Sequence, residues 1–192
     1  MHDNFLFDRF TEEWASLYAL MQHNPINRKR FYMVDNWYSM QPLIEGLDPR
    51  CSPSVVLEAN LEGRIDDKFD RPTYTVYMIA LADEREDNSL VAKRRAKDAL
   101  LAYRNLMNAF KNADPALEGM PFQKGSYLDS LRTAVFAGRK ILQAIDLNIR
   151  YESTGRVLDG WYGVFATFED CTPYNRCIDF NDYVLKEYET EE

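Results

Sequence analysis

The sequence predicts an α+β fold: a small antiparallel sheet of β-hairpins with a long helix packed across it, plus an N-terminal helix and a C-terminal arm. In residues 55–62, Val55, Leu57, Ala59 and Leu61 alternate with mostly polar residues, the pattern of a half-buried strand. Residues 73–81 are rich in β-branched and aromatic side chains and predict a second strand. Residues 88–112 repeat apolar side chains every three or four positions, as a helix does.

Length and composition indicate one folded domain with attached arms. The chain has 192 residues, and a hydrophobic share of 46% is enough to fill a core. We expect an N-terminal helical region in 1–53, an α+β core in 54–169 with an insertion at 113–144, and an arm in 170–192. A net charge of −8 argues against a protein that mainly binds phosphates, because cationic side chains drive such binding.

An amphipathic helix is predicted over residues 3–22. Its apolar residues recur at spacings of three or four and share one face: Leu6, Phe10, Trp14, Leu17 and Met21. Pro25 ends this helix, because proline lacks the backbone N–H that a helix interior needs. Residues 28–48 combine aromatic residues with an internal proline, and we expect a mixture of helix and loop there.

A polar loop, 63–72, joins the two central strands into a long hairpin, and such a tip can contact a neighbouring subunit in an assembly. Its charged residues are Asp66, Asp67, Lys68, Asp70 and Arg71. The three carboxylates could bind a hard cation through their oxygens, but they lack the order of an EF-hand loop. Because Lys68 and Arg71 compete for these carboxylates, we favour a solvated or subunit-contacting loop.

The long helix carries small apolar residues at its start, which allow close approach to a sheet, and larger ones toward its end. The stripe consists of Ala92, Ala96, Ala99, Tyr103, Leu106 and Phe110. Downstream, the pattern predicts a shorter helical or mixed stretch over 126–137, a strand over 145–151, a turn at 153–155 and a strand over 160–168.

The sequence offers little for catalysis. His2 and His23 are the two histidines, and neither lies beside a cysteine or serine motif. The chain contains neither a phosphate-binding GxxxxGK[ST] loop nor a GxGxxG motif, and its cysteines and histidines lack the spacing of a zinc site. We therefore predict no catalytic residues, no cofactor and no metal site.

The three cysteines, Cys51, Cys171 and Cys177, are too few for a disulfide framework. We expect free thiols in a reducing cytosol, with a bridge between Cys171 and Cys177 left open. The N-terminal residues lack the pattern of a signal peptide, and the apolar runs fall short of the roughly 20 residues that span a bilayer.

A basic run, Arg28, Lys29 and Arg30, precedes an aromatic cluster, and basic groups beside stacking rings are how proteins bind single-stranded nucleic acid. The alternative is a surface charge cluster beside core aromatics, which the net charge favours. We interpret the basic side of the predicted helix 88–112 in the same way, as a solvated face or a subunit contact. Twelve Tyr, eleven Phe and three Trp indicate either protein–protein contacts or simply a large core.

The order of elements carries a family resemblance. An N-terminal helix, a strand ending in acidic residues (Val55 to Glu62), an aromatic strand (Tyr74 to Leu81), a long helix and a closing hairpin resemble the tail-terminator and tail-completion proteins of tailed bacteriophages. The likeness covers about 54–169. In that family, β-hairpins and a crossing helix form a small domain that closes into a ring. The additions at 23–53, at 113–144 and after 169 would suit a neck ring of a large phage, such as the crAss-like group.

The resemblance implies a structural virion protein, made in the bacterial cytoplasm, that forms a homo-oligomeric ring at the head–tail junction. Its partners would be further copies of itself and the neighbouring portal, neck and tail proteins, with no membrane. DNA would pass without sequence-specific binding, and carboxylates such as Asp66, Asp67 and Asp70 could line the lumen or the ring interface. Two alternatives remain: a non-catalytic adaptor that binds another protein, and a metal-dependent enzyme using the acidic loop.

Overall fold

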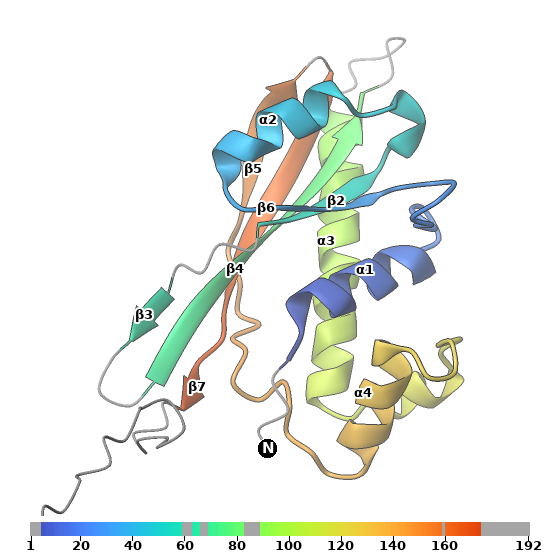
Figure 1. Ribbon diagram of the computed structural model, residues 1–192, viewed down its shortest axis with the longest axis vertical. Coiled ribbons are helices and arrows are strands. Elements are labelled where there is room, and N and C mark those ends of the chain that lie inside the picture. Colours follow the sequence, from blue (N-terminus) through green and yellow to red (C-terminus); the bar gives the residue numbers. More distant parts are fainter. Residues whose placement is uncertain (1–4, 59–62, 66–68, 83–88, 159, 174–192) are drawn as a thin grey trace, which may run out of the picture.

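The computed structural model describes residues 5–58, 63–65, 69–82, 89–158 and 160–173, and it confirms the α+β class (Figure 1). The sheet strands lie in the order β1 (Phe31–Val34), β2 (Ser54–Glu58), β4 (Phe69–Leu81), β6 (Trp161–Glu169) and β5 (Tyr151–Leu158). The helices are α1 (Phe7–Leu17), α2 (Trp37–Glu45), α3 (Ser89–Lys111) and α4 (Tyr127–Phe136), with 3-10 turns at Pro49–Cys51 and Pro115–Gly119.

The sheet is mixed, so the prediction of a purely antiparallel sheet is wrong at one edge. Strand β1 pairs parallel to β2, whereas β2 with β4, β4 with β6, and β5 with β6 are antiparallel. A parallel pair needs a crossover connection, and α2 supplies it between β1 and β2. Both β1 and α2 lie in the region where helix and loop were expected; β1 was missed because four residues are too few for a clear alternation.

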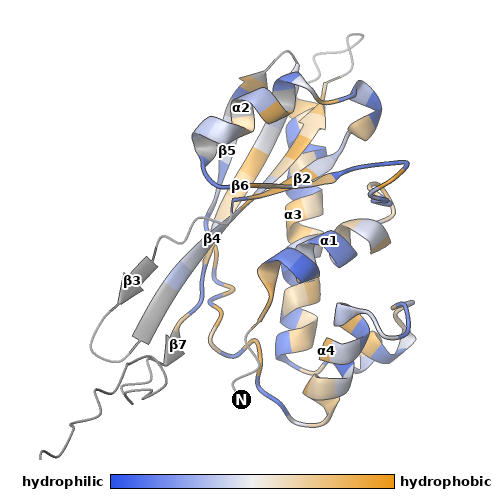
Figure 2. Ribbon diagram, viewed as in Figure 1, coloured by the Kyte–Doolittle hydropathy of each residue, from blue (hydrophilic) through white to orange (hydrophobic). Residues whose placement is uncertain are grey.

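The larger core lies between the sheet and α1, α3 and α4. As predicted, α3 packs across β4 and β6, and its alanines at 92, 96 and 99 are buried against the sheet. Figure 2 shows hydrophobic residues along the central strands and interspersed with hydrophilic ones along α3. This core combines residues from the predicted N-terminal region, from the core domain and from the insertion at 113–144.

A second, smaller core lies on the opposite face, which α2 covers. It includes Met40 of α2, Val56 of β2, and Tyr77 and Ile79 of β4. Strand β2 is consequently buried on both faces, and the expected half-buried strand is corrected. The hydroxyl of Tyr77 donates to the buried Glu58 carboxylate at 2.7 Å, and burial raises the pKa of Tyr77 well above its ordinary value.

The strand predicted over 145–151 is instead irregular chain, and β5 begins where that strand was expected to end. Ile145 and Leu147 are buried as their alternation suggested. Ile145 forms an isolated antiparallel bridge with Asp170, and side chains of α3 bind the carbonyls, with Lys111 donating to Ile145 and Arg104 to Leu147. The predicted turn at 153–155 lies inside β5, where the pairing register with β6 shifts.

The N-terminal helix is present but shorter than predicted, since α1 ends at Leu17. Phe10, Trp14 and Met21 are buried as expected, whereas Leu6, just before the helix, is exposed. The long helix and the helix over 126–137 are confirmed as α3 and α4.

The hairpin between the central strands extends well beyond the predicted strand. Strand β4 begins at Phe69, and its first residues pair with β3 (Gly63–Ile65) and β7 (Thr172–Pro173). Asp70 and Arg71, expected in a loop, therefore lie in a hydrogen-bonded strand, while 66–68 lie outside the described residues. The predicted C-terminal arm therefore begins inside the sheet, because β7 pairs with β4. The rest of that arm, 174–192, lies outside the described residues.

Candidate functional site

Arg30 does not form part of an exposed basic patch. Its side chain is buried, with a relative exposure of 6%. The guanidinium donates to four backbone carbonyls, those of Leu20, Arg50, Ser52 and Pro53, at 2.6–3.2 Å. Because these carbonyls belong to segments more than twenty residues apart, Arg30 ties the turn after α1 to the chain entering β2. Burial lowers the pKa of Arg30.

Arg28 and Lys29 are exposed, so the predicted patch is split between a buried and a solvated part. Arg28 donates to the side-chain oxygen of Gln22 at 2.9 Å, and the ammonium of Lys29 lies 5.0 Å from the ring centre of Tyr32. The backbone of Asn24 and Arg28 forms an isolated bridge that closes the turn between them. This half of the prediction, a surface charge cluster, describes Arg28 and Lys29 but not Arg30.

His23 also serves the same junction. It is buried, and its Nδ1 accepts the backbone N–H of Arg30 at 2.9 Å, which requires an unprotonated Nδ1. Its Nε2 lies 3.9 Å from the Glu12 carboxylate. Burial lowers the pKa of His23, against the opposing influence of Glu12. His2 lies outside the described residues.

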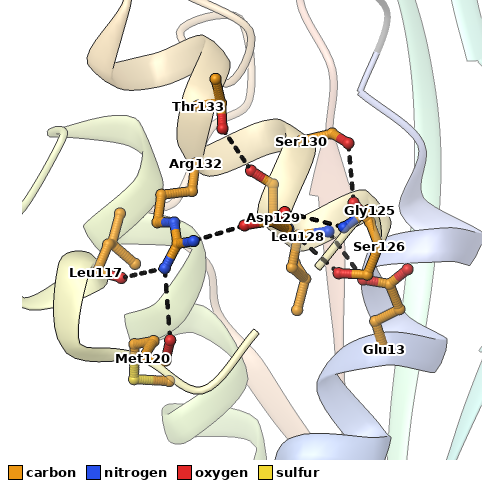
Figure 3. A network of polar contacts seen from close by, with 10 residues as sticks. All are labelled: Glu13, Leu117, Met120, Gly125, Ser126, Leu128, Asp129, Ser130, Arg132 and Thr133. Carbon is orange, nitrogen blue, oxygen red and sulfur yellow. Dashed lines mark hydrogen bonds and ion pairs between the residues drawn. The ribbon is translucent and has the colours of Figure 1, made fainter. Parts of the chain in front are cut away.

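A carboxylate from α1 meets the start of α4. The two oxygens of Glu13 accept the backbone N–H groups of Tyr127 and Leu128 at 2.7 and 2.8 Å. Figure 3 shows the contact with Leu128. The first N–H groups of a helix have no partner within the helix, so this carboxylate supplies acceptors that α4 itself lacks. The contact holds the insertion at 113–144 against the N-terminal helix.

The same end of α4 carries a second polar network. Asp129 accepts the N–H of Gly125 at 3.0 Å and pairs with Arg132 at 2.5 Å (Figure 3). These contacts, the Gly125 N–H first, hold the pKa of Asp129 below its ordinary range. Arg132 also approaches the carbonyls of Leu117 and Met120 at 3.4 and 3.5 Å. Every charged group in this cluster is occupied by a neighbour in the fold, which favours a structural role.

Several exposed apolar side chains lie near the two ends of the strand order, while Leu6, Leu90, Val91 and Phe136 are exposed before α1 and on α3 and α4. In β1 and the turn before it, Met33 is 52% exposed and Ile26 88%, and Leu20, in the turn after α1, is exposed as well; Tyr38, in the first turn of α2, is 87% exposed. At the β5 end, Tyr151 and Leu101 are exposed. The sequence patterns did not predict this distribution. Ile26 carried a usable signal, because an apolar residue between a proline and an asparagine lies in a probable turn, whereas Met33 gave none.

A cavity of about 400 Å³ lies between α3 and the chain that leads into β5. We call it the basic groove; its lining residues are Lys97, Leu100, Leu101, Arg104, Leu147, Asn148, Ile149 and Tyr151. None of these described lining residues is acidic. The cations Lys97 and Arg104 of this groove belong to the basic side of 88–112, whose interpretation as a solvated face or a subunit contact stays a prediction.

The described ranges contain no group of three or more His, Cys, Asp or Glu side chains placed to hold a metal ion. Within those same ranges, none of the helices is long and apolar enough to cross a membrane. Cys177 lies outside them, so the expectation of free thiols, with a Cys171–Cys177 bridge left open, stays a prediction.

Comparison with known proteins places the chain in no family. No protein-family model, no curated protein and no solved structure matches it.

Proposed function

We propose that this chain is a structural protein that assembles head to tail with copies of itself into a ring. The observation that carries the proposal is the exposure of apolar side chains at both ends of one sheet, Met33 of β1 with Ile26 in the turn before it, and Leu101 and Tyr151 near β5. Removing apolar surface from water is the main driving force of protein association. Two such surfaces on one molecule provide two contact sites.

The two surfaces differ in composition, which favours a heterologous contact over a two-fold dimer. A two-fold interface uses the same patch on both subunits, whereas contact between two different patches produces a ring when the rotation closes. The β1 end is formed by a parallel edge strand and the turn before it, and the β5 end by an antiparallel strand beside α3. Such contacts would also cover strand edges, which natural proteins commonly protect.

The setting we propose for this ring is the neck or tail terminator of a tailed phage, through which DNA passes. The support is the resemblance in element order, together with a net charge of −8, which disfavours retention of DNA phosphates. Asp66, Asp67 and Asp70 stay candidates for the lumen or the ring interface on their sequence alone.

A second candidate is an adaptor that holds a different protein. It is favoured by the unequal size of the two surfaces, because the β1 end carries Leu20 and Ile26 in addition to Met33. An adaptor would use this end alone and would remain a monomer or dimer by itself.

Light scattering on the purified full chain tests the proposal through Met33→Glu. We expect the wild-type particle to contain several copies, and we expect the charge at position 33 to reduce its mass toward that of one chain. The matched control is Phe136→Glu, which places the same charge at an exposed apolar residue of α4. Equal masses for the wild type and Met33→Glu would contradict a contact at the β1 end, and a monomeric wild type would favour the adaptor.

A further inference from the structure

The basic groove combines charge with apolar surface. The ammonium of Lys97 lies 5.3 Å from the ring centre of Tyr151, and one turn earlier that of Lys93 lies 5.5 Å from the ring centre of Tyr162. Leu101 supplies an exposed apolar side chain between these cations and Arg104. The groove therefore suits a ligand that carries negative charge and apolar or aromatic groups along one strand.

The chain itself contains a segment of this chemistry. Residues 174–192 hold six acidic and two basic side chains, a net charge of −4, which is half of the charge of the whole chain. Four aromatic residues are interspersed among them: Tyr174, Phe180, Tyr183 and Tyr188. This segment lies outside the described residues and follows β7, whose Pro173 pairs with Phe69 of β4.

We propose that the segment 174–192 of a neighbouring copy binds in the basic groove. This proposal rests on the self-assembly proposed above, since the groove lies at the β5 end, where the next copy would be. Nineteen residues follow Pro173, and an extended chain of that length spans roughly 60 Å, enough to reach another subunit. Opposite charges across the contact would guide the segment and fix its register.

Nucleic acid is the other polyanion that such a groove could attract. The net charge of −8 disfavours it, because the chain as a whole repels phosphates, whereas the segment is brought close by assembly. The experiment below treats DNA binding as an outcome that overturns the proposal.

Photo-crosslinking in the full-length protein tests the contact directly. A photoreactive amino acid replaces Leu101, and this protein is mixed with unmodified full-length chain labelled with heavy nitrogen. We expect mass spectrometry to find crosslinks from position 101 to peptides of 174–192 that carry the heavy label. Crosslinks only within one chain, crosslinks only to other surfaces, or preferential crosslinking to added duplex DNA would overturn the proposal.

Charge reversal shows whether the contact depends on the groove. Lys97 lines the groove, and Lys93 lies one turn earlier beside the Tyr162 ring, outside the lining residues. Lys93→Glu with Lys97→Glu leaves Arg104, whose side chain donates to the Leu147 carbonyl, intact. We expect this variant to lower the crosslink yield about tenfold, which corresponds to losing two modest ion pairs. The control Arg95→Glu reverses an exposed cation on a different face of α3 from Lys93 and Lys97, and its yield should stay within about twofold. An unchanged yield in the double variant would contradict the proposal.

Compensating changes separate this contact from general damage. Glu187→Lys with Glu189→Lys should restore crosslinking to the Lys93→Glu, Lys97→Glu protein, and failure to restore it would count against direct pairing. The particle mass, measured in parallel, separates the two proposals. Intermolecular crosslinks in a dimer would support the groove contact and refute the ring. A ring without these crosslinks would support the ring and refute the groove contact.

Discussion

The carboxylate of Glu13 in α1 accepts the backbone N–H of Leu128 in α4 at 2.8 Å, across 115 positions of sequence. Its second oxygen accepts the N–H of Tyr127, so one acidic side chain serves two N–H groups at the start of α4. Ser126 and Asp129 satisfy further N–H groups of this turn from within. The insertion at 113–144 is thereby fixed to the N-terminal helix and shares its core, and it does not behave as a separate appendage.

We predict that Glu13→Ala lowers the free energy of unfolding by about 2 kcal/mol, the usual effect of removing a charged acceptor from a helix N-terminus. Urea denaturation followed by circular dichroism measures this. The control Glu118→Ala removes an exposed acidic side chain from the nearby 3-10 turn and should change the free energy by less than about 0.5 kcal/mol. A loss below that limit for Glu13→Ala would refute the capping role.

Arg30 should be among the most sensitive positions of the chain. Arg30→Ala leaves four backbone carbonyls without their donor, and we expect a loss of more than about 3 kcal/mol in the free energy of unfolding. Arg30→Lys should recover only part of it, since an ammonium cannot reproduce the planar fork of a guanidinium.

The matched control is Arg28→Ala, two residues earlier, which removes one exposed hydrogen bond to Gln22. We expect a change within about 0.5 kcal/mol there. Equal losses of unfolding free energy for Arg28→Ala and Arg30→Ala, measured by the same denaturation experiment, would contradict the distinct structural role of Arg30 and favour one exposed basic patch.

His23 makes stability depend on pH. Burial lowers its pKa from the ordinary value of 6.5, so the folded protein binds a proton less readily than the unfolded chain. The stabilising contribution of neutral His23 is complete above pH 6.5, and it is lost as the pH falls from 6.5 through the lowered pKa. Urea midpoints measured across this window should decrease more steeply for the wild type than for His23→Asn, whose side-chain oxygen can still accept a hydrogen bond. Parallel curves would show that other groups govern the pH dependence.

Gly163 is required by a close approach between β6 and β4. A Cβ there would lie 2.6 Å from the carbonyl oxygen of Met78 and 2.9 Å from Cγ2 of Ile79. We predict that Gly163→Ala lowers the melting temperature by about 4–8 °C, the effect of about 2 kcal/mol in a chain of this size. Gly119→Ala, where a Cβ meets nothing within 4 Å, should leave the melting temperature nearly unchanged. Equal effects at the two glycines would contradict the described packing.

Local patterns predicted the elements that are long or strongly periodic. The stripe of α3 and the strands β4 and β6 were identified because many residues repeat one period. The pairing of β1 with β2 was missed because it depends on a crossover through α2, and no pattern within four residues encodes a distant parallel partner. Ile145 and Leu147 alternate like a strand, yet side chains of α3 bind their carbonyls, an arrangement set by tertiary contacts.

The candidate surfaces were less predictable than the fold. Arg28, Lys29 and Arg30 are equivalent in sequence, and only the surrounding carbonyls of other segments distinguish the buried third residue. The sequence patterns indicated the basic side of the long helix, but the ring that completes the basic groove, Tyr151, comes from a strand far along the chain. The burial of Arg30 and the lining of the groove depend on contacts between segments that are distant in sequence, which local sequence patterns do not specify.

Electron microscopy of the purified full-length chain tests the central claim most directly. Head-to-tail assembly through the two ends of the sheet predicts closed rings of uniform size with a central opening. Particles no larger than one or two chains, at all concentrations tested and after addition of a candidate neck partner, would contradict it.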